Sequence, residues 1–300
     1  MTGFWRILKW ATLGVAIAAL LLAYPVSIAV SHRLPSGIPS DLPEGVWADA
    51  RIGAAIELLE TEMDDRGWAS ARHSWHPQAR LTAMPAFQSG LTDVVSEFAR
   101  RRAELANASR PDRDLILASG LLAQAISEEA ESRIRAAIEA MRRFDGLKAR
   151  AVLSDLSRDD LFAQEISLYS DLLNSSAEDL ARMSRTGSRA PVSPARTEIY
   201  FRVLGRIYAI GALLKASEAI SITEPGYRSA FAAAQTALSQ ALKPRPLIVS
   251  NPAPGTFSLG GDDVVVLAFL VGQTHTQLEA LNALIAGTPS SGSLPLVQKS

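Results

Sequence analysis

Two histidines three residues apart, His73 and His76 in the segment "HSWHP" (73–77), are the first candidates for chemistry in this chain. Two imidazoles at that spacing could bind one metal ion, but no H-E-x-x-H motif surrounds them and the sequence suggests no third ligand. His275 lies among threonine and glutamine residues and could act as a general base. Ordinary polar positions explain all three histidines better, so the sequence predicts no metal site and no cofactor.

Acidic residues are plentiful, as in "EEAE" (128–131) and the pair at 262–263. Neighbours in sequence point in different directions on a helix, so solvated faces and helix N-termini explain them better than a glycosidase-like carboxylate pair. The chain has no G-x-S-x-G motif, no lysine three residues after a serine and no glycine-rich phosphate loop. Cysteine is absent, which removes thiol nucleophiles and cysteine-based metal sites. The sequence therefore predicts no catalytic residues.

The charge balance argues against nucleic acid as a partner. Thirty basic and 31 acidic residues give a net charge of −1, so no global positive field is present. The segment "ARRR" (99–102) is a small basic patch that could bind phosphate or anionic lipid, although a solvated outer helix face is the simpler interpretation. A hydrophobic fraction of 48% with 20% charged residues is typical of a folded chain.

A candidate membrane anchor precedes all of these residues. Residues 11–30, "ATLGVAIAALLLAYPVSIAV", carry no charge, and twenty residues of helix span a hydrocarbon core of about 30 Å. Arg6 and Lys9 precede this run, whereas the segment after it has more acidic than basic residues. The positive-inside rule predicts a cytoplasmic N-terminus at residues 1–10 and places residues 31–300 in the periplasm.

A cleaved signal peptide is the alternative to this anchor. The small residues of "SIA" (27–29) follow Pro25 and would allow cleavage after Ala29. The apolar run is longer than the usual signal core of about 7–15 residues, which favours an uncleaved anchor in a bacterial inner membrane. Residues 31–45 are rich in proline and glycine and predict a linker between membrane and domain.

The rest of the chain shows helical periodicity from residue 46 to residue 286. We therefore expect an all-α fold, in which an N-terminal transmembrane helix is followed by a bundle of about eight helices (46–286). A break at "TGSRAPVSP" (186–194) could divide this region into two bundles or simply join two long helices. Gly205 and Gly211 interrupt a long helix and suggest close packing of a neighbour. Residues 287–300 form a polar tail.

Short motifs in the first third of the chain carry a resemblance. "GW" (67–68), then "WHP" (75–77), then "PAFQSG" (85–90) lead into a long helix. This order resembles a bacterial family of membrane-anchored, all-helical envelope proteins known only as a domain of unknown function. The segment "PLIVSNPAPGTFSLGGDDVVVLAFLVG" (246–272) is similar to that family near its C-terminus. The resemblance implies topology and fold, and it implies no catalytic residues.

The order of residues in this motif region is more specific than local packing requires, so we treat four of them as candidate partner contacts: Trp75, Met84, Phe87 and Gln88. Simple packing of the loop onto the bundle is the alternative. The function that the sequence favours is a non-catalytic envelope interaction or scaffold protein, because tethering raises the effective concentration near membrane partners. Expected partners are the inner membrane, through residues 11–30, and other envelope proteins. A lipid or small-molecule binding protein and a peptidoglycan- or lipid-acting hydrolase are the alternatives.

Overall fold

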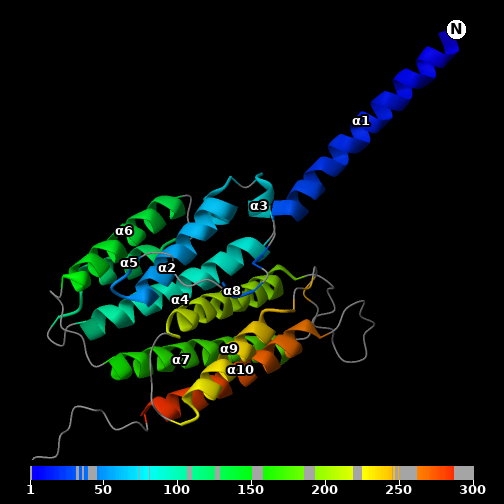
Figure 1. Cartoon of the computed structure of the whole chain (residues 1–300). Helices are drawn as coiled ribbons and strands as arrows, with labels where there is room; N and C mark the ends of the chain where they lie inside the picture. Colours follow the sequence, from blue (N-terminus) through cyan, green and yellow to red (C-terminus); the bar gives the residue numbers. More distant parts are fainter. Residues whose placement is uncertain are drawn as a thin grey trace, which may run out of the picture.

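The structure is a computed structural model, and all of the regular structure that it describes is helical (Figure 1). The predicted all-α class is therefore confirmed for the described part of the chain. That part comprises residues 2–31, 34–35, 37–39, 46–73, 75–80, 82–106, 110–125, 129–150, 158–185, 193–218, 225–244, 246, 249 and 262–286. The helices are α1 (Thr2–Ser31), α2 (Ala50–Thr61), α3 (Pro77–Arg80), α4 (Ala83–Ala106), α5 (Arg113–Ala123), α6 (Ala130–Ala149), α7 (Arg158–Arg185), α8 (Pro194–Ala216), α9 (Tyr227–Ala241) and α10 (Asp263–Ala286).

The helices after α1 form one bundle, and α1 projects away from it (Figure 1). In the described ranges these are eight helices of eleven or more residues and the four-residue α3, which agrees with the prediction of about eight. α4 packs against α8 and α5, and α10 packs against α7 and α9. α8 also contacts α2, α7 and α9, so it joins the two sides of the bundle.

A single hydrophobic core runs through the bundle and contains residues from α2 as well as α10. Fully buried side chains such as Phe98, Tyr169, Ile207 and Leu278 belong to it. The core is therefore continuous across the break predicted near 186–194, most of which lies outside the described residues. Residues 287–300, the predicted tail, also lie outside them.

Local sequence signals explain several helix ends. The Asp49 carboxylate caps α2 by accepting a hydrogen bond from the backbone N–H of Arg51, at 3.1 Å. Asp112 caps α5 in the same way, accepting from the N–H of Leu115 at 3.0 Å. A π-helical turn follows α2 and ends at Gly67, whose φ of +71° favours glycine.

α4 and α8 approach each other so closely that their backbones touch at two glycines. A Cβ atom on Gly90 would lie 1.9 Å from the carbonyl oxygen of Arg202, and one on Gly205 would lie 1.9 Å from the carbonyl oxygen of Phe87. Only glycine fits at such a crossing. The predicted role of Gly205 in close packing is confirmed.

The segment after α1 does not stand clear of the bundle. Leu34 and Ile38 are partly buried and pack against the core. Ile38 lies against Gly211 of α8, where a Cβ atom would come 2.5 Å from the isoleucine Cδ1. Residues 40–45 of the predicted linker lie outside the described ranges. The described part of this linker therefore contacts the domain.

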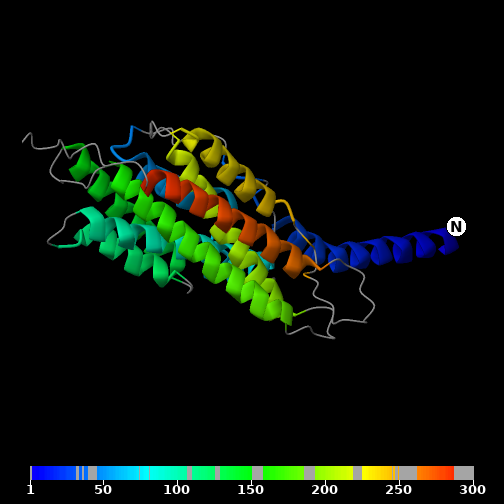
Figure 2. The same cartoon turned by 90° about the horizontal axis from the view of Figure 1, so that it is seen from below.

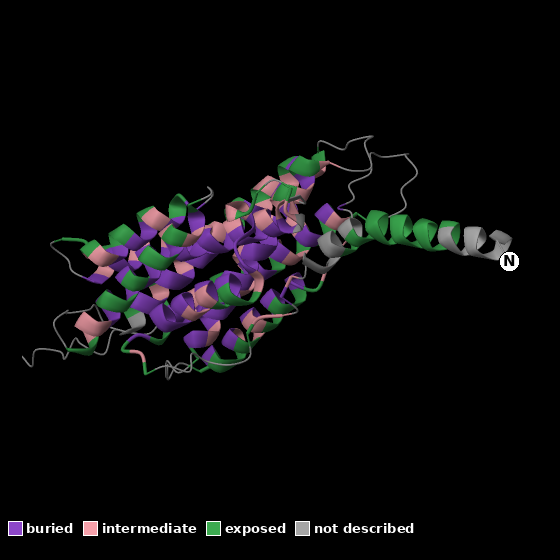
Figure 3. Ribbon diagram, turned by 90° about the horizontal axis from the view of Figure 1, so that it is seen from above, coloured by how far each residue is buried: buried purple, intermediate pink, exposed green. Residues whose placement is uncertain are grey.

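Two apolar helices differ in their surroundings. Among the described residues, the helix that is long and apolar enough to cross a membrane is α10, whereas the apolar segment Trp10–Ala23 of α1 is shorter. The N-terminal span that we expected is therefore not the helix that length and hydropathy select. A core helix passes the same test, and α10 buries one face from Val264 to Ile285 against its neighbours. In α1, every side chain from Trp10 to Ala23 is exposed (Figure 3).

Candidate functional site

Three of the four predicted contact residues lie inside the bundle. Met84, Phe87 and Gln88 have exposed fractions of 0%, 2% and 1%. Buried side chains cannot touch a partner, so the prediction of a partner contact is wrong for these three. Trp75 is 69% exposed and remains a candidate contact.

Gln88 fixes the loop that follows α2. Its side-chain amide donates to the carbonyl oxygen of Gly67 at 2.9 Å, and its side-chain oxygen accepts from the backbone N–H of Ala69 at 2.8 Å. Between them, the buried Trp68 donates its indole N–H to the carbonyl oxygen of Ala125 at 3.2 Å. Buried polar groups need such partners, and Gln88 supplies them for two backbone groups of the loop.

The motif order "GW" to "PAFQSG" is thereby explained as packing. Gly67 makes the turn, Trp68 anchors the loop to the end of α5, and Gln88 ties the loop to α4. Phe87 enters the core, and Gly90 admits α8. These packing roles account for the residue types and their spacing, and they involve no partner protein.

The histidines of the "HSWHP" segment shape a local turn. The N–H of His76 donates to the carbonyl oxygen of His73 at 2.8 Å, and His76 Nδ1 accepts from the N–H of Gln78 at 3.2 Å. In the described ranges, no three histidine, aspartate or glutamate side chains are grouped so as to hold a metal ion. The geometry thus gives His76 a role at the start of α3.

A serine, a histidine and a glutamate meet between α7 and α10. Ser170 Oγ lies 2.8 Å from His275 Nδ1 and donates to Glu279 Oε1 at 2.5 Å. In a hydrolase triad the carboxylate binds the second nitrogen of the histidine, which in turn activates the serine. Here the carboxylate binds the serine itself, and Ser170 is 1% exposed. The cluster fastens α7 to α10 and does not form a triad.

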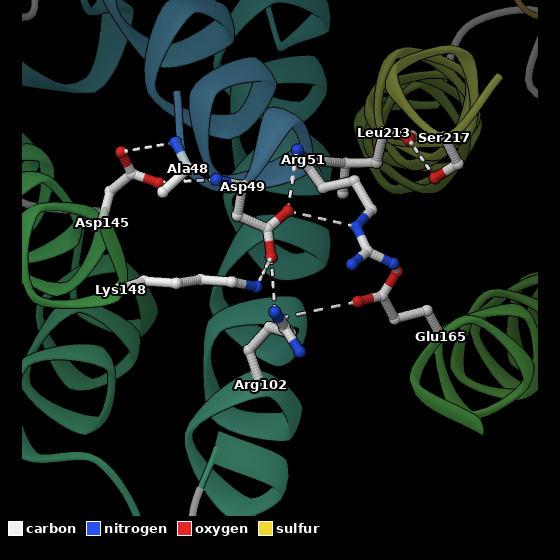
Figure 4. Close-up of polar contacts among 9 residues, drawn as sticks. All are labelled: Ala48, Asp49, Arg51, Arg102, Asp145, Lys148, Glu165, Leu213 and Ser217. Atoms are coloured by element: carbon white, nitrogen blue, oxygen red, sulfur yellow. Dashed lines mark hydrogen bonds and ion pairs between the residues drawn. The ribbon is translucent and has the colours of Figure 1, made fainter. Parts of the chain in front are cut away.

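The most extensive polar arrangement is a buried ionic network centred on Asp49 (Figure 4). Asp49 Oδ1 lies 3.2 Å from Arg51 Nε, and Asp49 Oδ2 lies 3.0 Å from Lys148 Nζ. The same Oδ2 accepts a hydrogen bond from the guanidinium of Arg102. Three cations from α2, α4 and α6 thus surround one carboxylate.

Glu165 of α7 completes the network. Its Oε2 lies 2.7 Å from Arg51 Nη1, and its Oε1 lies 3.8 Å from Arg102 Nε. Asp145 of α6 accepts from the backbone N–H of Asp49 at 2.8 Å and so holds the start of α2. The network therefore connects α2, α4, α6 and α7, which are far apart in sequence.

Burial and charge set the protonation of these carboxylates. Burial alone would raise the pKa of Asp49, but the three surrounding cations hold that pKa well below its usual range. For Glu165, burial raises the pKa to about 7, although Arg51 and Arg102 act in the opposite direction. Burial also raises the pKa of the neighbouring Tyr169 well above its usual value.

A carboxyl group with a pKa near neutrality would suit general acid–base catalysis. The Glu165 side chain, however, is 0% exposed and that of Asp49 only 2%, so no substrate reaches them in this structure. Removing one member of a buried ion pair leaves an uncompensated charge and costs about 3–5 kcal/mol. The network accordingly has a structural role: it holds four helices together.

The sequence patterns above did not predict this network, although a signal was present. Arg102 follows Phe98 by four residues, which places it on the apolar face of α4, and Glu165 follows Phe162 by three. A charged residue on the apolar face of a helix is expected to be buried, and it then needs a buried residue of opposite charge. The expectation of a solvated face for "ARRR" is wrong for Arg102, which is fully buried.

No family model matches this chain, and no curated protein or solved structure matches it. The resemblance to a bacterial envelope family therefore remains a prediction.

Proposed function

We propose that this chain is a single-pass protein of a bacterial inner membrane, anchored by α1, whose periplasmic helical bundle acts as a non-catalytic interaction or scaffold domain. In this arrangement residues 1–10 are cytoplasmic and residues 31–300 are periplasmic. The protein would belong to the envelope family that its motifs resemble.

The observation that carries this proposal is the contrast between α1 and the bundle. Fourteen consecutive residues, Trp10–Ala23, form an apolar helix whose side chains are all exposed. Large side chains such as Leu20 and Leu21 are 77% and 70% exposed. Exposing such a surface to water costs about 25 cal/mol per Å². The hydrocarbon core of a bilayer accommodates the same surface without this cost. Arg6 and Lys9, which precede the apolar segment within α1, favour a cytoplasmic N-terminus.

The interior of the bundle supports a non-catalytic role. Asp49 and Glu165, two carboxylates with displaced pKa values, are buried and bind other parts of the chain. Its serine, histidine and glutamate cluster lacks the order of a catalytic triad. A tethered domain that binds other proteins needs no reactive group, since tethering supplies effective concentration.

The anchor is tested by single-cysteine labelling, for which the absence of natural cysteine is an advantage. Thr2→Cys and Ser175→Cys would be treated with a membrane-impermeant maleimide in cells whose outer membrane has been permeabilised. We expect labelling at position 175, an exposed site on α7, and labelling at position 2 only after the inner membrane is broken. Equal labelling at both positions in intact inner membranes would contradict the proposal. So would a soluble product beginning at Val30, which would indicate a cleaved signal peptide.

The interaction role is tested by photo-crosslinking from Trp75 in the full-length protein. The matched control is a probe at Gln164, which is exposed on α7. We expect a protein adduct at position 75 that the control does not give, and that is reproduced when the probe is placed on the captured protein. A probe at position 75 that captures no protein would remove the one exposed residue of the predicted contact set.

A further inference from the structure

On α10, the exposed large apolar side chains are concentrated at the beginning of the helix. Val265 and Val266 are 44% and 48% exposed, and Phe269 is 70% exposed. The opposite face of the same helix packs into the core through Val264 and Leu267. The first two turns of α10 are therefore apolar on the buried side and also on the open side.

The open side of α10 changes character along the helix. Thr276 and Ala283 follow Phe269 by seven and fourteen residues, so all three lie on nearly the same face. Gln273, Thr276 and Ala283 are exposed like Phe269, but they are polar or small. On α10, the exposed apolar surface is thus limited to the beginning of the helix.

α1 leaves the bundle at that same end, as two perpendicular views agree (Figures 1 and 2). α1 contacts α3, and Leu34, three residues after the last residue of α1, packs on the core. Three residues of extended chain reach only about 10 Å. If α1 crosses a bilayer, the end of the bundle must therefore lie close to the bilayer surface.

From this position we infer that the face of α10 formed by Val265, Val266 and Phe269 inserts into the surface of the lipid bilayer in which α1 is anchored. This inference rests on the proposed anchoring by α1. A lipid surface fits the patch because the patch is apolar, lies at the α1 end and gives way to polar residues with distance from that end. Contact at both α1 and α10 would hold the bundle in one orientation on the membrane.

The test places an environment-sensitive NBD fluorophore on single cysteines of the full-length protein, which contains no natural cysteine. The probe positions are Phe269→Cys on the patch and Leu20→Cys in α1. The matched control is Ala283→Cys, an exposed site on the same face of α10 and about 21 Å further along the helix. The protein is reconstituted in nanodiscs of phosphatidylcholine and phosphatidylglycerol, with and without brominated lipid. Thermal unfolding of each variant checks that the bundle is intact.

We expect blue-shifted emission and quenching by brominated lipid at positions 20 and 269, together with water-like emission and quenching by iodide at position 283. Lipid quenching at position 20 with water-like emission at position 269 would overturn the inference and leave the anchor standing. A blue shift at 269 without lipid quenching would mean that a second copy of the chain covers the patch, which also overturns it. Water-like emission at position 20 would overturn both proposals.

Discussion

α1 and α10 are both rich in apolar residues, yet they meet opposite surroundings. Leu20 and Leu21 of α1 are 77% and 70% exposed, whereas Leu267 and Leu278 of α10 are fully buried. α10 lies against α7 and α9 along its length, and α1 projects away from the bundle (Figure 1). Hydropathy selects α10 as the possible membrane span, but packing against neighbouring helices explains the apolar residues of its buried face without a membrane.

The difference shows that hydropathy alone does not distinguish a core helix from a membrane helix. The distinction depends on whether neighbouring helices cover the apolar side chains. A helix whose apolar face is matched by neighbouring helices stabilises the fold, and its loss would unfold the domain. A helix whose apolar side chains are exposed all round needs another solvent, and its loss should leave the domain folded. The two helices should therefore respond differently to the same substitution.

The strongest test of this comparison is one arginine in each helix. Leu267→Arg buries a charge among apolar side chains and should lower the free energy of unfolding by more than about 4 kcal/mol. Leu20→Arg should leave the thermal unfolding of the bundle unchanged but disfavour membrane insertion by about 3 kcal/mol. Circular dichroism melts in detergent and the membrane-bound fraction in cells measure the two effects.

A matched control is Ala283→Arg at an exposed site of α10, which should change neither property. If Leu20→Arg destabilised the bundle as strongly as Leu267→Arg, α1 would be part of the folded core and the comparison would fail.

The next largest effect is expected in the ionic network. Arg102→Met removes one cation and leaves Asp49 and Glu165 buried with less compensation, which should lower stability by about 3–5 kcal/mol. Arg100→Met on the same helix removes an exposed partner of Glu97 and should cost about 0.5 kcal/mol or less. Urea unfolding of the two variants gives the comparison. Similar losses would show that Arg102 is no more important than a surface arginine.

Much of the fold follows from local patterns in the sequence. Helical periodicity predicts about eight helices after the N-terminal helix, and the glycine at position 205 of a long helix predicts a close helix contact; both features are present. These features depend on residues within one or two turns of one another. They are set by backbone geometry and by the apolar stripe of each helix.

The polar interior does not follow from local patterns. Arg102 bonds to Asp49 over 53 positions and Arg51 to Glu165 over 114, and only the tertiary fold brings these residues together. For the same reason, the sequence around Gln88 could not show whether the loop faces the bundle or a partner. A motif specifies residue types, whereas the direction of a side chain depends on elements that are distant in sequence.

The pH dependence of stability tests the buried state of Glu165. An unfolded glutamate titrates near pH 4.3, so between that value and the folded pKa of about 7 the folded state binds more protons. The stabilisation is fully present below the unfolded pKa and is lost as pH rises through 7. We expect the free energy of unfolding to fall by about 3 kcal/mol between about pH 5 and about pH 8.

Glu165→Gln cannot ionise, so this decline should disappear in that variant. Glu178→Gln, at an exposed position of the same helix, should keep it. Asp49 contributes in a different window, because its lowered pKa gives stability that is lost only as pH falls below about 4. An unchanged slope in Glu165→Gln would mean that Glu165 stays ionised beside its arginines.

The smallest expected effects distinguish a glycine that is needed from one that is not. Gly90→Ala and Gly205→Ala place a methyl group against the backbone of the facing helix and should each lower stability by about 1–3 kcal/mol. Gly120→Ala in α5 has open space around it and should raise stability by about 0.5–1 kcal/mol, because alanine favours helix. Denaturant unfolding measures both signs, and in all three variants the membrane-bound fraction should stay constant because α1 is untouched. A loss of stability in Gly90→Ala with a gain in Gly120→Ala would show that contact between α4 and α8, not helix propensity, decides where this bundle requires glycine. A gain of stability in both variants would mean that α4 and α8 lie further apart than described.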